Sequence, residues 1–311
     1  MNVIYSENYN FDTGLLSYFH PFYGMKFKSI FNDLKNNSKI RFHMPDSAID
    51  EQIIDDYLSG IMKYRVKNKK GILRALEFPP IPFLSYSYLD KHVLTPMRFG
   101  IAGTLLGAQK AIQENTIFWN LAGGYHHASH QNMEGFCIYN DITICYQELR
   151  RRNILSADDR ILIIDTDAHH GNGNAVDFMD NRQVTILDIY NRDIYPQSQY
   201  TRERVDIPVP LPEKTPGIHY LNQYRNALNK INGNYKIAFV VTGTDPLEAD
   251  KLGGLSLTIS NIAQRDKTTW QFLSEKQIPA VFLGGGGYSK LSATCVTRAI
   301  NGICRYRHRS A

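Results

Sequence analysis

Short runs of β-branched and other apolar residues recur along the second two thirds of the chain. They lie at 116–121, 161–164, 184–189, 237–242 and 280–283. Continuous apolar runs of this length, bounded by turn-forming residues, are typical of strands that are buried on both faces. The pattern therefore predicts several buried strands.

Between these runs, apolar residues recur every three or four positions, which is the spacing of an amphipathic helix. Two such sets are Ile138, Ile142, Cys145 and Leu149, and Leu221, Tyr224, Leu228 and Ile231. Strands that alternate with helices predict an α/β fold, in which a mostly parallel sheet is covered by helices on both faces.

Four of the predicted strands are followed at once by polar, glycine-rich segments. These segments are GGYHH, DTDAHHGNGN, TGTD and GGGGY. In open α/β sheets, binding sites form in the crevice at the carboxyl ends of the strands. We therefore expect these segments, which lie far apart in the sequence, to converge on one pocket.

Length and composition are those of an ordinary globular protein, with 311 residues, 43% hydrophobic and 21% charged. We find no linker, repeat or low-complexity run that would mark a domain boundary, so we expect a single domain over residues 1–311. The proline-rich segment at 78–83 predicts a rigid loop, which either covers the pocket or is only structural.

Several features indicate the cellular setting. The N-terminal residues do not resemble a signal peptide, and no apolar run reaches the roughly 20 residues that span a bilayer. The four cysteines form no C-x-x-C pair, which favours reduced, buried thiols. The net charge of +5 is modest, and its basic clusters are typical of solvated helix ends and a frayed tail. We expect a cytoplasmic protein without a membrane span or a nucleic-acid partner.

Metal-binding residue types follow one of the buried strands. Asp165, Asp167 and His169 stand at two-residue spacing, so they point to one side if the extended conformation continues. A D-x-D pair alone more often caps a helix, but the added imidazole and the glycine-rich loop behind it favour a metal. Zn²⁺ suits carboxylate and imidazole ligands, and Fe²⁺ would accept them too. Asp245, after a later strand, is the best-placed further ligand.

Two adjacent histidines, His126 and His127, follow Gly-Gly after another predicted strand. A single histidine on an apolar face is usually a core residue, but a pair at the pocket edge is harder to explain in that way. Histidine titrates near neutral pH, so it can move a proton between a water molecule and a leaving amine. Asp165 is the obvious candidate to orient one ring, and nothing ties His130 to the site.

Tyr288 follows four consecutive glycines, which let the backbone pass close to a ligand. Its hydroxyl could donate a hydrogen bond to an oxyanion opposite the metal. Glycine-rich loops also bind phosphates, but the sequence has no GK[ST] and no G-x-G-x-x-G that opens a helix. The pocket is therefore predicted to perform metal-assisted acid–base chemistry.

Taken together, these segments resemble the histone deacetylase family. GGYHHA, EGFCIYND, IIDTDAHHGNG, GTD and GGGGY occur in the family's order. The likeness is closest to class IV, and it rests on HPFYGMK, EFPPIPFL, DFMD, YNRDIYP, GTDPLEADKLGGLSLT and the following RD. The resemblance runs from about residue 3 to about residue 303. It implies the arginase/deacetylase α/β fold, with a basic tail beyond the core.

The resemblance also implies a zinc-dependent amidohydrolase that removes acetyl or longer acyl groups from the lysine side-chain nitrogen. The zinc ligands that it implies are Asp167, His169 and Asp245. His127 would be the general base and then the acid to the lysine amine. His126, paired with Asp165, would give electrostatic support, and Tyr288 would stabilise the oxyanion.

The family likeness extends to residues around this centre. Gly135, Phe136 and Tyr195 match positions that line the narrow acyl-lysine tunnel. Asp165 and Asp188 match a site for a monovalent cation, K⁺ or Na⁺, beside the zinc. Other members carry a serine at the position of Asp188, so this match is the weakest.

Three other functions remain open. A deacetylase of acetylpolyamines or other small amides would need similar catalytic residues. An arginase-like enzyme would need two metals, bridging carboxylates and more ligands than this set supplies. A non-catalytic protein that binds acyl-lysine would need no proton-transfer groups. The likeness favours an acyl-lysine protein or peptide as the substrate.

Asn172 stands where some classes of the family orient the second histidine with an aspartate. A neutral amide stabilises an imidazolium less than a carboxylate does, which leaves His127 a weaker base. Asn172→Asp should therefore raise the apparent pKa that defines the acidic limb of the plot of kcat/KM against pH. An unchanged pH profile would contradict this prediction.

Overall fold

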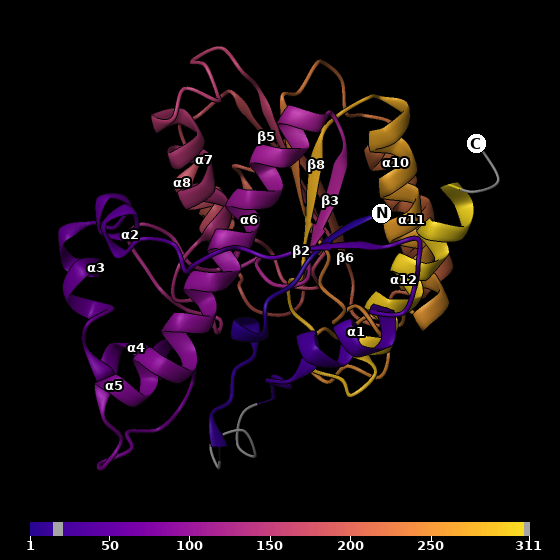
Figure 1. Cartoon of the computed structure of the whole chain (residues 1–311). Coiled ribbons are helices and arrows are strands. Elements are labelled where there is room, and N and C mark those ends of the chain that lie inside the picture. The colour runs from indigo at the N-terminus through magenta and orange to yellow at the C-terminus, as the bar shows by residue number, and fades with distance from the viewer. Residues whose placement is uncertain (15–20, 308–311) are drawn as a thin grey trace.

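Eight strands form one sheet through the middle of the molecule, and every neighbouring pair is parallel (Figure 1). In chain order they are β1 (Asn2–Ile4), β2 (Arg41–His43), β3 (Ile117–Asn120), β4 (Ile161–Asp165), β5 (Val184–Asn191), β6 (Ile207–Leu211), β7 (Ile237–Val241) and β8 (Ala280–Leu283). Their order across the sheet is β2-β1-β3-β8-β7-β4-β5-β6. This computed structural model describes residues 1–14 and 21–307.

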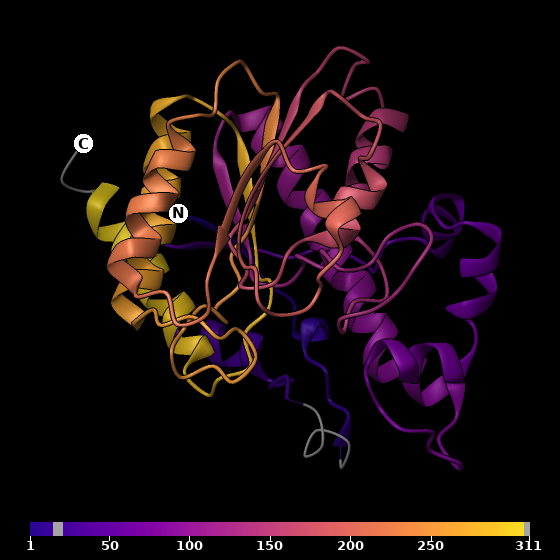
Figure 2. The ribbon, with the colours of Figure 1, turned by 180° about the vertical axis from the view of Figure 1, so that it is seen from behind.

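Helices cover both faces of the sheet (Figures 1 and 2). One layer contains α6 (Thr95–Glu114), α7 (Asp141–Arg151) and α8 (Asn172–Asp177). The other contains α1 (Lys26–Leu34), α10 (Gly217–Leu228), α11 (Ile259–Glu275) and α12 (Ser292–Arg307). The remaining helices are short: α2 (Glu51–Tyr57), α3 (Gly60–Arg65), α4 (Lys69–Ala75), α5 (Tyr86–Leu89), α9 (Gln199–Arg202), the 3₁₀ helix η1 (Glu7–Tyr9) and the π-helix η3 (Asp90–Leu94). The predicted α/β fold is confirmed.

The central strands are buried along their whole length, because a helical layer lies on each face. Every residue of β3, β4, β7 and β8 is buried. This explains why their sequences read as unbroken apolar runs rather than as alternating patterns. The five predicted strands match β3, β4, β5, β7 and β8, and differ from them only at their ends.

Both predicted helices exist but are shorter than the apolar spacing suggested. Ile138 precedes α7, which begins after the cap residue Asn140, whose side chain accepts a hydrogen bond from the backbone N–H of Thr143. Ile231 likewise follows the end of α10. Both residues are buried in the core. Apolar spacing therefore continued past the helix ends because the flanking loops are also packed.

Three strands were not predicted from the sequence. β1 and β2 are only three residues long, too short for a periodic signal. β6 contains Pro208 and Pro210, which lack a backbone N–H and are exposed at the edge of the sheet. Proline is tolerated on an edge strand because one side of the strand needs no hydrogen-bonding partner.

The four polar segments follow β3, β8, β7 and β4, which are neighbours in the sheet. Because parallel strands end on the same side, the segments converge at the centre of the carboxyl edge.

The proline-rich segment at 78–83 is a loop, as predicted. Phe78 lines a cavity at the carboxyl edge of the sheet, whereas Phe83 is fully exposed.

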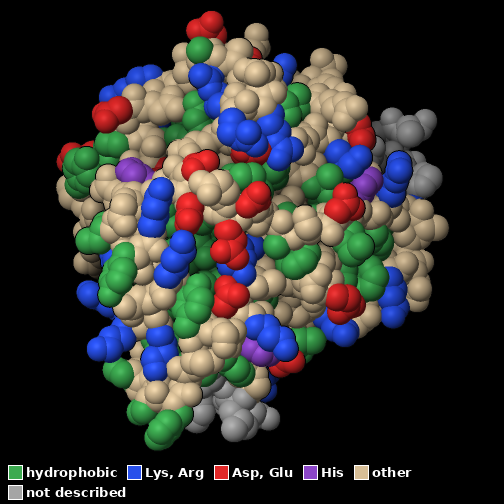
Figure 3. Space-filling view, turned by 60° about the vertical axis from the view of Figure 1, so that its left-hand side comes forward, with side chains coloured by type: hydrophobic (Ala, Val, Ile, Leu, Met, Phe, Trp, Pro, Cys, Tyr) green, Lys and Arg blue, Asp and Glu red, His purple; other side chains and the backbone are tan. Residues whose placement is uncertain are grey.

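The face that carries α2 to α5 is shown in Figure 3. Acidic and basic side chains are interspersed there, with single hydrophobic side chains between them. Exposed Ile61 and Tyr64 belong to α3. Within the described part of the chain, no helix is both long and apolar enough to cross a bilayer.

Arg265 of α11 connects two of the converging segments. Its guanidinium is fully buried and donates hydrogen bonds to the backbone oxygens of Thr166 at 3.0 Å and Gly243 at 2.8 Å. It also pairs with buried Asp266 at 2.7 Å. One side chain therefore holds the ends of β4 and β7 together.

Arg265→Met should lower the free energy of unfolding by about 3–5 kcal/mol, because it leaves the buried carboxylate of Asp266 without its partner. Urea unfolding followed by circular dichroism would measure the loss. The double variant Arg265→Met/Asp266→Asn removes the stranded charge and should recover part of that stability. A loss below about 1 kcal/mol in the single variant would contradict this role.

Candidate active site

Three side chains meet at the carboxyl ends of β4 and β7: Asp167, His169 and Asp245. All three are buried, and one ligand atom from each lies within 4.8 Å of the other two. The Nδ1 atom of His169 is 2.8 Å from Oδ2 of Asp245 and 3.1 Å from Oδ1 of Asp167. The fold therefore brings together the three residues that the sequence suggested as metal ligands.

This group requires positive charge. Among the residues that the structure describes, no lysine or arginine forms an ion pair with Asp167 or Asp245, and their ionic partners are histidine rings. Buried carboxylates without a counter-charge are strongly unfavourable. Two carboxylates and one imidazole suit a divalent ion such as Zn²⁺ or Fe²⁺. The residues thus fit a metal ion, whose identity they leave open.

Backbone contacts keep the carboxylates in place. The N–H of Gly286 donates to Oδ2 of Asp167 at 2.8 Å, and the N–H of Ala168 donates to Oδ1 of Asp245 at 2.9 Å. A Cβ atom at Gly243 would lie 2.1 Å from Oδ2 of Asp167. Only glycine lets this backbone approach the carboxylate so closely, which explains the TGTD sequence.

The two adjacent histidines have different partners. Nδ1 of His126 lies 2.7 Å from Oδ2 of Asp165, whereas Nδ1 of His127 lies 2.7 Å from Oδ1 of Asn172. Both pairings match the sequence-based expectation. His130 instead pairs with Asp177 at 2.6 Å.

The surroundings of the two rings shift their pKa values in opposite directions. Burial disfavours the charged form of His126, but the carboxylates of Asp165 and Asp167 outweigh it and raise its pKa to about 9. Burial lowers the pKa of His127 well below its usual value, and the neighbouring rings of His126 and His169 lower it further. The surroundings therefore favour the charged form of His126 and the neutral form of His127.

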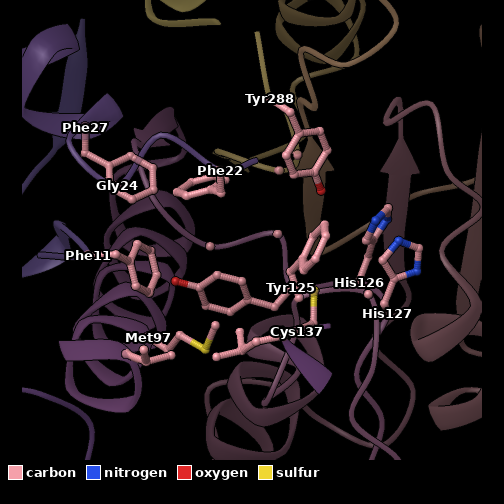
Figure 4. A pocket seen from close by; sticks show the side chains of 18 of the residues that line it. Phe11, Phe22, Gly24, Phe27, Met97, Tyr125, His126, His127, Cys137 and Tyr288 are labelled. Atoms are coloured by element: carbon pink, nitrogen blue, oxygen red, sulfur yellow. The ribbon is translucent and has the colours of Figure 1, made fainter. Parts of the chain in front are cut away.

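A cavity leads to these histidines, and its lining includes Gly135, Phe136 and Tyr288 (Figure 4). The rings of Phe136 and Tyr288 lie 5.6 Å apart, edge to face. Gly135 has φ +54°, and a Cβ there would lie 2.5 Å from Cδ2 of His127. Glycine is thus required for both its conformation and its closeness to the ring.

Beyond the histidines the cavity continues into an apolar chamber. Its wall includes Phe11, Phe22, Phe27 and Met97 (Figure 4). Tyr195, also predicted to line the tunnel, has its ring 5.3 Å from that of His127 but borders a second hollow beside the cavity. Gly135 and Phe136 therefore line this cavity, and Tyr195 borders the adjacent hollow beside His127.

Asp165 and Asp188 are side by side in the register of β4 and β5. Oδ2 of Asp188 accepts a hydrogen bond from the N–H of Gly171 and lies 2.6 Å from Nδ1 of His170. Its Oδ1 atom is buried and has no hydrogen-bond partner within the described residues. A buried carboxylate oxygen without a donor fits a cation beside it.

Sequence reasoning missed the charged residues that support these groups. Asp141 accepts from the N–H groups of Gly124 and Tyr125, Asp250 accepts from those of Tyr288 and Ser289, and Lys26 donates to the backbone oxygen of Gly286. Lys26 is fully buried, and burial lowers its pKa to about 8. A single charged residue in the sequence gives no pattern that distinguishes such a supporting position from a solvated one.

Known proteins resemble this chain along most of its length. The histone deacetylase domain family matches residues 20–303. Histone deacetylase 2 of Arabidopsis thaliana is 31% identical over 98% of this chain and 79% of its own length. Histone deacetylase B of Dictyostelium discoideum is 31% identical over 80% of this chain and 57% of that protein. The acetoin utilization protein AcuC of Bacillus subtilis is 31% identical over 60% of this chain and 51% of that protein.

A solved structure shares the fold. The crystal structure of the HDA15 HD domain superimposes with a TM-score of 0.74 and covers 98% of this chain and 90% of that one. The two sequences are 16% identical, so this likeness concerns the fold alone.

Zinc binding to the metal-free protein should release protons, because His169 binds a metal only as a neutral imidazole. The two carboxylates outweigh burial and raise the pKa of His169 to about 10, and burial raises that of Asp245 to about 7. At pH 7 the release should be about one to two protons per zinc, and it should vanish above pH 10.

Titration calorimetry in buffers of different ionisation enthalpy measures this release. His130→Gln, which alters a histidine outside the group, should leave it unchanged. Zinc binding without proton release at pH 7 would contradict the assigned ligand group.

Proposed function

The chain belongs to the histone deacetylase family, and from this premise we propose that it is a zinc-dependent hydrolase that removes acyl groups from the lysine side-chain nitrogen. Family membership supports deacetylase activity on acetylated substrates. One observation carries the finer proposal: the buried Asp167–His169–Asp245 group lies beside a pair of histidines that line an apolar cavity, and the pKa is raised in one of these rings and lowered in the other.

In this proposal, Asp167, His169 and Asp245 would hold the ion, which would polarise the acyl carbonyl and make the attacking water more acidic. His127 takes the proton of the attacking water on Nε2, because its Nδ1 faces the oxygen of Asn172. The same ring then gives the proton to the departing lysine amine.

Two further groups balance the negative charge that develops on the acyl oxygen. Burial and the carboxylates of Asp167 and Asp245 raise the pKa of Tyr288 well above its usual value, so its hydroxyl remains a donor. Such a donor stabilises an oxyanion most effectively in a site that excludes water. The imidazolium of His126, held by Asp165, adds positive charge nearby.

The shape of the cavity supports an acyl-lysine substrate. Phe136 and Tyr288, whose rings pack edge to face in the cavity wall, would present apolar ring surface to the unbranched methylenes of lysine. The chamber beyond the histidines has an apolar wall that would accept a longer acyl chain, in keeping with the class IV likeness. We therefore propose that fatty acyl groups are substrates as well as acetyl.

Three further assignments complete the proposal. Asp165 and the unpartnered oxygen of Asp188 would bind K⁺ or Na⁺. Residues 1–311 would act as one catalytic domain. The four cysteines are buried thiols, which suits the reducing conditions of the cytoplasm.

Hydrolysis of acyl-lysine peptides, from acetyl to myristoyl, by the zinc-loaded protein tests the proposal. Tyr288→Phe should lower kcat by about 10²–10³-fold, because it removes the oxyanion donor. Asp167→Ala should abolish turnover together with zinc binding. Exposed Tyr200 offers a matched control, and Tyr200→Phe should retain wild-type activity. The preferred chain length reports how much of the inner chamber the acyl group occupies.

Zinc-loaded protein that hydrolyses none of these peptides would contradict the lysine deacylase proposal. Turnover of acetylpolyamines or other small amides would then identify the alternative substrate class. Peptide binding without any turnover would indicate a protein that recognises acyl-lysine but does not cleave it.

A further inference from the structure

Asn172 lies between the ring of His127 and the carboxylate of Glu134. Its Oδ1 is 2.7 Å from Nδ1 of His127, and its Nδ2 donates to Oε1 of Glu134 at 2.6 Å. Asn172 is buried, whereas Glu134 is partly exposed. A carboxylate therefore contacts the proposed general base through one intervening amide.

We propose that Glu134 is a positioning residue: by orienting the amide of Asn172, it holds His127 in the tautomer whose Nε2 is free to accept a proton. This inference rests on the proposed function, in which His127 is the general base. It adds a third member, Glu134, to the pair of His127 and Asn172.

The orientation of the amide and the tautomer of the ring follow from what each group can donate or accept. A carboxylate only accepts hydrogen bonds, so Glu134 must face the NH₂ group of Asn172 and not its oxygen. The oxygen of Asn172 then faces His127, and because it also only accepts, Nδ1 must carry the hydrogen. A neutral imidazole has one N–H, which leaves Nε2 as the acceptor. The low pKa of His127 is consistent with the neutral ring.

Asparagine needs such a partner, whereas aspartate would not. The two ends of an amide are similar in size, and a rotated Asn172 would present its NH₂ group to Nδ1. That arrangement places the hydrogen on Nε2, where it prevents the ring from acting as a base. A carboxylate at position 172 has no donor end, so it would select the productive tautomer without help.

The backbone fixes Glu134 for this contact. Its N–H donates to the oxygen of Cys137 at 3.1 Å, and the N–H of Cys137 donates to the oxygen of Glu134 at 2.9 Å. The turn between them carries Gly135 and Phe136, which line the cavity. Nearby Tyr195 has its pKa raised by burial and by the carboxylate of Glu134. The turn that forms the cavity wall therefore also presents the orienting carboxylate.

Glu134→Gln is the matched variant, because it keeps the size of the side chain but offers either an oxygen or an NH₂ group to Asn172. We expect kcat to fall about tenfold, as is typical for groups that orient a site residue, with KM little changed. Exposed Glu203 supplies the control, and Glu203→Gln should have no effect.

Nitrogen-15 NMR of histidine-labelled, zinc-loaded protein reports the tautomer independently of turnover, with His127→Gln used for assignment. Wild-type His127 should carry its hydrogen on Nδ1, and Glu134→Gln should populate both tautomers. If Glu134→Gln leaves both the tautomer and kcat unchanged, the proposal is wrong. If the tautomer shifts in a protein that hydrolyses no substrate, the positioning role holds and the proposed function fails.

The Asn172→Asp variant provides a second background, in which an orienting role of Glu134 can be distinguished from a purely structural one. In Asn172→Asp the new carboxylate lies against Glu134, so the two negative charges repel each other. Adding Glu134→Gln to that variant should therefore raise kcat, the opposite of its effect in the wild type. A loss of similar size in both backgrounds would show that Glu134 only supports the local fold, and would overturn the proposal.

Discussion

Four buried carboxylates at the carboxyl edge of the sheet impose the constraint on which the rest of this structure depends. Asp165, Asp167, Asp188 and Asp245 are each at most 1% exposed, and they follow or lie in neighbouring strands. Such a cluster requires counter-charge and hydrogen-bond donors, because water cannot reach it. Backbone N–H groups and the rings of His126, His169 and His170 supply such contacts, and the Asp167–His169–Asp245 group could also hold a metal ion. Glycine at position 243 and the buried Arg265 keep the loops close enough to supply those contacts.

The same cluster explains why two adjacent histidines differ. His126 contacts a carboxylate directly and is held as an imidazolium, whereas His127 contacts an amide and remains neutral. A carboxylate placed directly on Nδ1 of His127 would both orient the ring and stabilise its charged form. Placed behind Asn172, the carboxylate of Glu134 can orient the ring with a weaker effect on its charge. The intervening amide thus separates orientation from charge stabilisation, which suits a base that must be neutral before the reaction.

The sequence predicted most of what lies at the centre of the fold and less at its edges. The central strands are apolar throughout because both of their faces are covered, whereas β1 and β2 are too short for a pattern and β6 contains prolines at the sheet edge. Asp167, His169 and Asp245 could be grouped because they follow strands that end on the same side. The sequence could not add three supporting residues to this group: Glu134, Asp250 and Lys26. Each of them acts through one amide or through backbone atoms that only the folded chain brings near. Tyr195, which the family likeness placed in the tunnel wall, has its ring 5.3 Å from that of His127 and borders the adjacent hollow. The catalytic roles of these residues remain predictions.

We propose that the Asp167–His169–Asp245 group holds a single catalytic metal ion. Elemental analysis of protein purified without added metal, and again after zinc loading and desalting, tests this most directly. We expect about one divalent transition-metal ion per chain, lost in Asp245→Asn and retained in Tyr288→Phe. Two ions per chain would indicate an arginase-like site, and no retained metal after loading would contradict the assignment of the group as a metal centre.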